Sequence, residues 1–284
     1  MYYFETGFHV RIASVDSHFS HHVTGFMSWV FSMADRFYTP QPIGVGEFIL
    51  DGPESHHLTT VRRFAIGDCV VMFNGDGHEY MAEIIAVNRK QVMLNVVSVQ
   101  AVDRELDFEL VIASAMPKGD RGEYLVEKLT ELGVTRFIPL ITSRSVVTPK
   151  ASSVEKYQRG VIEASKQCGR NRLMAVDLPV TWAEFLRSPS GTSQRYVLHT
   201  QLGNDGLPHN PIAAITHPQT VTVAVGPEGG FTTEEIDAAI HHGYKVLSCG
   251  PRVLRVETAA TAIAAWLGLN GISNLAFPGS GRLP

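Results

Sequence analysis

Sixteen residues late in the chain read Thr220-Val-Thr-Val-Ala-Val-Gly-Pro-Glu-Gly-Gly-Phe-Thr-Thr-Glu-Glu235. The first six are apolar or β-branched without interruption, which is typical of a strand buried on both faces. Thr232 and Glu235 then form a capping-box pattern in front of Ile236, which predicts a helix. A strand, a short loop and a helix make up the repeating unit of a parallel α/β sheet.

The same alternation extends outward from this segment in both directions. We expect further strands at 109–115, 136–141, 195–199 and 244–248, and further helices at 120–132, 152–169 and 257–270. The second of these helices begins at a Ser152-Ser-Val-Glu155 capping-box pattern and stops at Gly169. The pattern predicts an α/β domain with a mostly parallel sheet and helices on both faces.

The front of the chain has a different pattern. Between residues 36 and 103 we expect strands such as 69–73 and 91–97, a turn at 74–77 and one short helix near 56–63. Short strands with few helices between them favour a small β-barrel.

The glycine-rich loop is the first candidate site. Gly226, Gly229 and Gly230 allow close approach of a ligand to the backbone. The loop lacks the Gly-Lys-Ser/Thr of a P-loop and the G-x-G-x-x-G of a dinucleotide site. Glu228 would also repel a phosphate, so a cationic or neutral ligand fits better. A tight turn that only packs the helix on the strand is the alternative.

A second loop, Gly250-Pro-Arg-Val-Leu-Arg-Val-Glu-Thr-Ala-Ala260, also follows an expected strand and precedes a helix. Ligands of open parallel sheets bind outside the carboxyl ends of the strands. We therefore expect the two loops to line one crevice. Alternatively, Arg252 and Arg255 cap surface carbonyls, and Glu257 only complements the helix dipole.

Charge is unevenly distributed. The net charge is −4, yet residues 118–172 carry 11 Lys/Arg and 6 Asp/Glu, a local net of +5, which leaves −9 elsewhere. A basic segment in an acidic protein indicates a contact surface for a polyanion or, equally well, a solvated, salt-bridged helical face.

Composition excludes several classes of protein. With 284 residues, 44% hydrophobic and 18% charged, the chain is an ordinary globular protein. Its apolar runs are far shorter than the ~20 residues that span a bilayer. Three cysteines without a CxxC argue against a zinc ribbon and fit a cytoplasmic location. The histidine pairs lack metal-ligand spacing, so no metal site is expected.

The two ends of the chain look separate from these domains. We expect residues 1–32 to be an extension, either disordered or the product of a misassigned start before Met33. A signal peptide is a weaker alternative, because Arg11 is the only basic residue and no A-x-A site follows. Residues 273–284 are expected to form a flexible tail.

Taken together, the motifs resemble one family. They are the Gly-Pro-Glu-Gly-Gly loop, the 250–259 loop, Lys118-Gly-Asp-Arg121 with Glu127-Lys-Leu-Thr-Glu-Leu-Gly133, and Glu163-Ala-Ser-Lys-Gln-Cys-Gly-Arg-Asn171. Residues 33 to about 270 resemble the bacterial ribosomal small-subunit methyltransferase E family. The resemblance implies a PUA-like barrel over 33–105 and a SPOUT methyltransferase domain with a trefoil knot over 106–272.

The resemblance also implies an activity. The family uses S-adenosylmethionine to make N3-methyluridine in 16S rRNA and works as a homodimer. S-Adenosylmethionine carries a sulfonium cation and no phosphate, which agrees with a glycine loop that contains Glu228 and no lysine.

Site residues follow from the resemblance and from the loops. The implied cofactor contacts are Leu198, His199, Gly226, Glu228, Gly229, Gly230, Leu247, Gly250, Val253, Leu254 and Arg255. The candidate RNA contacts are Arg63, Lys118, Arg121, Arg144, Arg170 and Arg172. For chemistry, Arg255 is the candidate for stabilising the uridine anion and Glu257 for general base.

Two other functions stay open at this point. One is a non-catalytic RNA-binding protein that has kept the fold, which the intact cofactor loops disfavour. The other is a Rossmann oxidoreductase, which the missing G-x-G-x-x-G and the late position of the glycine loop disfavour.

Overall fold

The computed structural model describes residues 36–88, 91–188, 194–199, 220–250 and 252–271. All of them belong to the second of two units into which the chain divides, Met33–Pro284. The expectations for residues 1–32 and 273–284 lie outside the described residues.

The front domain is built on one five-stranded sheet with the strand order β1-β3-β4-β5-β2. Its elements are β1 (Arg36–Tyr38), β2 (Gly46–Asp51), α1 (Gly52–His56), a π-helical turn (His57–Val61), β3 (Cys69–Phe73), β4 (His78–Val87) and β5 (Gln91–Ala101). Alternate residues of β4 and β5, such as Ile84 and Leu94, face a core closed by Leu58 of the π-helical turn. The predicted β character of this region is confirmed.

The second sheet has seven strands, and every strand pair in it is parallel. The strand order is β12-β10-β11-β6-β7-β8, with β9 also paired to β7. The strands are β6 (Glu109–Ala115), β7 (Arg136–Ile141), β8 (Ala175–Val176), β9 (Val180–Thr181), β10 (Gln194–Leu198), β11 (Thr220–Val225) and β12 (Lys245–Leu247). The predicted parallel sheet is confirmed, and β8 and β9 are additional.

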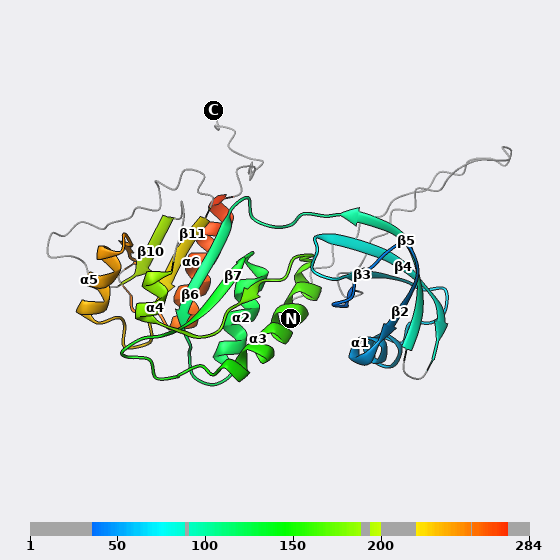
Figure 1. Ribbon diagram of the computed structural model, residues 1–284, viewed down its shortest axis with the longest axis horizontal. Helices are drawn as coiled ribbons and strands as arrows, with labels where there is room; N and C mark the ends of the chain where they lie inside the picture. Colours follow the sequence, from blue (N-terminus) through cyan, green and yellow to red (C-terminus); the bar gives the residue numbers. More distant parts are fainter. Residues whose placement is uncertain (1–35, 89–90, 189–193, 200–219, 251, 272–284) are drawn as a thin grey trace, which may run out of the picture. The chain divides into compact units, whose positions relative to one another are not determined.

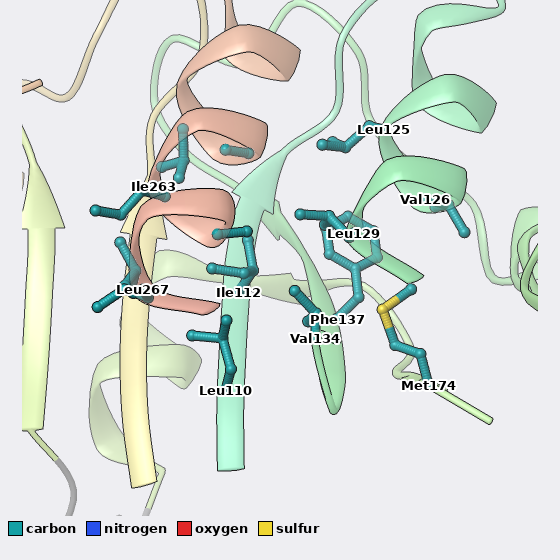
Figure 2. Packing of buried hydrophobic residues seen from close by; sticks show 14 of the residues in the cluster. Leu110, Ile112, Leu125, Val126, Leu129, Val134, Phe137, Met174, Ile263 and Leu267 are labelled. Atoms are coloured by element: carbon teal, nitrogen blue, oxygen red, sulfur yellow. The ribbon is translucent and has the colours of Figure 1, made fainter. Parts of the chain in front are cut away.

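Helices cover both faces of this sheet (Figure 1). One face packs against α2 (Arg121–Glu131), α3 (Val154–Cys168) and α6 (Val256–Gly271), and the other against α4 (Trp182–Arg187) and α5 (Thr233–His241). Figure 2 shows the first face, where Ile112 of β6 lies near Leu129 of α2 and Ile263 of α6. Ala113, the next residue of β6, joins the opposite cluster. Burial on both faces explains the uninterrupted apolar runs.

Helix ends follow their sequence signals unequally. At α5, Thr232 accepts from the Glu235 backbone and Glu235 accepts from the Thr232 backbone, so this capping box is confirmed. The box predicted for α3 is wrong, because a 3₁₀ turn (Ala151–Ser153) precedes the helix and Ser153 caps it without a side-chain hydrogen bond. The predicted stop at Gly169 is confirmed, with a left-handed φ of +83° that favours glycine.

Charged side chains join the front domain to the end of α3. Lys166 donates to Glu54 at 2.9 Å, and Arg36 pairs with Glu79 and donates to the Arg170 carbonyl at 3.2 Å. Arg170 pairs with Glu105 of the segment that connects the two domains. These six charged residues are called the junction cluster: Arg36, Glu54, Glu79, Glu105, Lys166 and Arg170. Their cations are nearly fully buried, so the cluster is part of the fold.

Candidate active site

The glycine loop that follows β11 is folded back on itself. A Cβ on Gly226 would lie 3.0 Å from the Phe231 ring, so a larger residue would force this ring to shift. Phe231 is buried and its ring centroid lies 4.6 Å from that of Trp182 in α4. Gly230 has φ +66° and its N–H donates to the Pro227 carbonyl at 2.8 Å, which closes a tight turn. The loop is therefore both a turn and a backbone surface open to a ligand.

The loop after β7 braces the glycine loop. Arg144 Nη1 donates to the Gly229 carbonyl at 2.9 Å, and the Ser143 N–H donates to Glu235 Oε1 at 2.8 Å. Arg144 was expected at an RNA surface. In the structure its guanidinium donates to the Gly229 and Phe231 carbonyls and its side chain lines the cavity described below, and the RNA contact stays a prediction.

The second predicted loop follows β12 and leads into α6. The His199 N–H donates to the Leu247 carbonyl at 3.0 Å, which continues the pairing of β10 with β12 past the strand end. Gly250 has φ +96° and turns the chain, and Pro251 lies outside the described residues. The carboxyl ends of β10, β11 and β12 thus lie next to one another, as the strand order requires.

One cavity of about 360 Å³ opens at these strand ends. Eight of the eleven expected cofactor contacts line it: Leu198, His199, Gly226, Glu228, Gly229, Gly230, Val253 and Leu254. Leu247 lies in the core instead, and Gly250 and Arg255 lie outside the lining. Nine lining residues were not among the expected cofactor contacts, including Arg144, Cys249 and Arg252, although the last two are immediate neighbours of predicted contacts. Burial raises the pKa of Cys249, so its thiol is a neutral part of the wall.

An ion bridge connects this cavity to the starts of two helices. Arg121 Nη1 donates to Glu257 Oε1 at 3.2 Å, and Arg121 Nη2 lies 3.7 Å from Glu228 Oε1. Glu257 is only 7% exposed, and its Oε2 has no hydrogen-bond partner among the described residues. We call Arg121, Glu228 and Glu257 the pocket cluster. Arg121 was expected to contact RNA; the structure pairs it with two carboxylates, and the RNA contact stays a prediction.

The remaining basic candidates differ in exposure. Arg170 is 3% exposed, and its guanidinium is occupied by Glu105 and by the carbonyls of Thr130 and Val134. Its expected RNA contact is therefore wrong. Arg63, Lys118, Arg172 and Arg255 are exposed. Arg63 is also the only described non-glycine residue with a positive φ, +60°.

No helix within the described ranges is long and apolar enough to cross a membrane.

Two family models match the chain. Residues 104–268 match an RNA methyltransferase domain, and residues 50–97 match an RNA methyltransferase PUA domain. The first match covers the parallel sheet and its helices, and the second lies in the front domain.

Curated relatives and solved structures agree with these matches. Ribosomal RNA small subunit methyltransferase E of Synechocystis is 33% identical over 238 residues, covering 83% of this chain and 77% of the relative. The Bacillus subtilis protein of the same name is 30% identical, covering 75% and 86%.

Among structures, a putative methyltransferase from Legionella pneumophila in complex with the bound cofactor SAM has a TM-score of 0.74 at 34% identity, covering 83% and 97%. The Neisseria gonorrhoeae methyltransferase E bound to S-adenosyl methionine has a TM-score of 0.75 at 26% identity, with the same coverage. The shared domains, sequence and fold show that this chain belongs to the ribosomal RNA small subunit methyltransferase E family.

Proposed function

We propose that this enzyme transfers a methyl group from S-adenosylmethionine to N3 of a uridine in the 16S rRNA of the small ribosomal subunit. The observation that carries the proposal is the cavity at the ends of β10, β11 and β12, where a glycine loop presents Glu228 and no lysine. The two structural relatives that contain this cofactor support the choice of methyl donor.

The residues of the cavity fit this cofactor. A volume of about 360 Å³ is within the range of small-molecule sites, roughly 300–1,000 Å³. Glu228 provides a negative group for a sulfonium cation, and Arg252 provides a positive group for an amino-acid carboxylate. Leu198, Val253 and Leu254 provide apolar wall. When bound, S-adenosylmethionine supplies an electrophilic methyl group for direct displacement.

The acceptor nitrogen of uridine carries a proton that must be removed. We assign this task to Glu257, because its Oε2 has no hydrogen-bond partner among the described residues while Oε1 is held by Arg121. A carboxylate fixed by one oxygen keeps the other oxygen available to accept a proton. Arg255, two residues earlier and exposed, is the proposed cation for the uridine anion.

RNA is proposed to bind through exposed cations. Arg63 in the front domain, Lys118 before α2 and Arg172 after α3 remain candidates, since their side chains are exposed. A homodimer is also proposed, supported by exposed apolar side chains near the end of α6, Trp266 and Leu269.

Nucleoside analysis tests the proposal. Purified enzyme is incubated with small subunits from a strain that lacks it and with methyl-labelled S-adenosylmethionine, and the digested 16S rRNA is examined by mass spectrometry. We expect label in N3-methyluridine at one position. Label in another nucleoside would contradict the acceptor, and calorimetry showing binding of NAD instead of S-adenosylmethionine would contradict the reaction class.

A further inference from the structure

Arg121 is shared between two carboxylates from distant parts of the chain. It is the first residue of α2, whereas Glu228 lies in the glycine loop and Glu257 in the first turn of α6. Its guanidinium is 3.2 Å from Glu257 and 3.7 Å from Glu228, and its Nε donates to the Lys118 carbonyl at 3.2 Å. The side chain is 34% exposed, so the bridge lies at the edge of the cavity and not in the core.

Glu228 is the member of this cluster that lines the cavity. Without Arg121, two carboxylates would lie near the ligand with no described cation paired to either. Opposite charges a few ångströms apart interact strongly when water is partly excluded. Arg121 therefore reduces the negative charge that a bound ligand experiences.

This charge matters because methyl donor and product differ in charge. S-Adenosylmethionine has a sulfonium cation, and S-adenosylhomocysteine has a neutral thioether. Charge on the sulfur is lost as the methyl group leaves. A cavity that is too negative would stabilise the ground state more than the transition state, and such binding does not accelerate the reaction.

We propose that Arg121 tunes the charge of the cofactor cavity and so sets how strongly this site prefers the cationic methyl donor over its neutral product. The inference rests on the proposed use of S-adenosylmethionine. Arg121 is then a specificity-determining residue that acts through Glu228, and Glu257 holds it in place from the other side.

Calorimetry without RNA tests the proposal through the ratio of the two dissociation constants, Kd for S-adenosylhomocysteine over Kd for S-adenosylmethionine. In Arg121→Met we expect this ratio to rise about threefold to tenfold, and to fall toward the wild-type value as salt is added. Arg121→Lys should stay near wild type because it keeps the charge. Glu228→Gln should lower the ratio, since Arg121 would then face the sulfonium without its partner.

The matched control is Lys156→Met, which removes the same charge from an exposed pair with Glu123 on another helix. It should leave the ratio unchanged. Equal weakening of both ligands in Arg121→Met, or an unchanged ratio in a folded variant, would overturn the proposal. If Arg121→Met does not fold, Glu228→Gln decides alone, and an unchanged ratio there overturns it. Failure of the wild type to bind either ligand would instead contradict the proposed function.

Discussion

The junction cluster and the pocket cluster both pair basic side chains with glutamates, but the two clusters differ in how deeply the cations are buried. In the junction cluster, Lys166 and Arg170 have side chains no more than 5% exposed, and each makes close contacts with a carboxylate. In the pocket cluster, Arg121 is 34% exposed and divided between two carboxylates, and a buried oxygen of Glu257 has no described partner. Among the described residues, Arg36 Nε in the junction cluster also has no partner, but each buried cation there is paired with a carboxylate. Buried ion pairs between domains are part of the fold, whereas a half-exposed cation shared by two carboxylates beside a cavity can respond to a ligand.

The same distinction between paired and unpaired cations applies to the basic segment, residues 118–172. Of the 11 cations between residues 118 and 172, the described structure gives no ion pair or side-chain hydrogen bond to four: Lys118, Lys150, Arg159 and Arg172. The others pair with carboxylates or, like Arg144, with carbonyls. The local charge of +5 therefore overstates the surface offered to RNA.

The largest expected effect comes from the junction cluster. Arg170→Met leaves Glu105 without its buried partner and removes a donor from the Val134 carbonyl and one of the donors from the Thr130 carbonyl. We expect a loss of about 3–5 kcal/mol in the free energy of unfolding, measured by urea denaturation. Arg172→Met, two residues later and exposed, is the control and should change stability little. If the Arg170 variant had normal stability and weaker RNA binding, Arg170 would be an RNA contact and not part of a stabilising cluster.

The pocket cluster should respond in rate and not in stability. Glu257→Gln keeps an acceptor for Arg121 but removes the proposed base, so we expect single-turnover methylation to fall about 10²-fold or more with the thermal midpoint little changed. Arg255→Ala should also fold, bind the cofactor within a few-fold of wild type and lose ~10²–10³ in rate. If Glu257→Gln retains full rate while Arg255→Ala does not, the base lies elsewhere.

The junction cluster should also make the stability of the protein depend on pH in the acidic range. Burial by itself would raise the pKa of Glu79, but hydrogen bonds from Arg104 and Arg36 outweigh it and lower the pKa. Stability from these contacts is therefore present above the ordinary value of 4.5 and is lost as pH falls through the lower folded-state pKa.

Glu79→Gln should cost about 1–2 kcal/mol at neutral pH and make the loss of stability below pH 4.5 shallower. Denaturation at a series of pH values measures both. Glu83→Gln, on the same strand but without a described ion pair, should leave the acid profile unchanged. Identical profiles for the two variants would exclude a contribution from the junction.

The smallest effects are expected from the exposed cations. Replacing Lys118 or Arg172 with alanine should each lower the salt dependence of RNA binding by about one unit of slope, through one lost phosphate contact. Lys150→Ala, which lies outside the proposed contacts, serves as the comparison. If the two alanine variants had the same salt slope as the wild type, Lys118 and Arg172 would not contact RNA phosphates.

Sequence predicted the buried strands well because their signal is local. The strands at 69–73, 109–115, 136–141 and 220–225 have the predicted ends, since each is a β-branched or apolar run next to turn residues. The two-residue strands β8 and β9 are too short to show periodicity. The trefoil knot stays a prediction of the resemblance.

The site was predicted in its loops but not in its charges. Glycine loops can be recognised from their composition, and eight of the expected contacts line one cavity. The carboxylate partners of Arg121 and Arg170 could not be predicted because they are distant in sequence: Glu257 is 136 residues from Arg121, and Glu105 is 65 residues from Arg170. A charge count identifies a cation but not the carboxylate that neutralises it.

The stack of Trp182 on Phe231 gives the cavity an optical reporter. Phe231 lines the cavity and packs on Gly226, while Trp182 packs against the Phe231 ring and donates to the Glu235 carbonyl. Indole emission depends on such neighbours, so a ligand that shifts Phe231 changes the light that Trp182 emits. The chain has only three tryptophans, and in a Trp29→Phe, Trp266→Phe background the remaining fluorescence would follow occupancy of the cavity in real time without any attached dye.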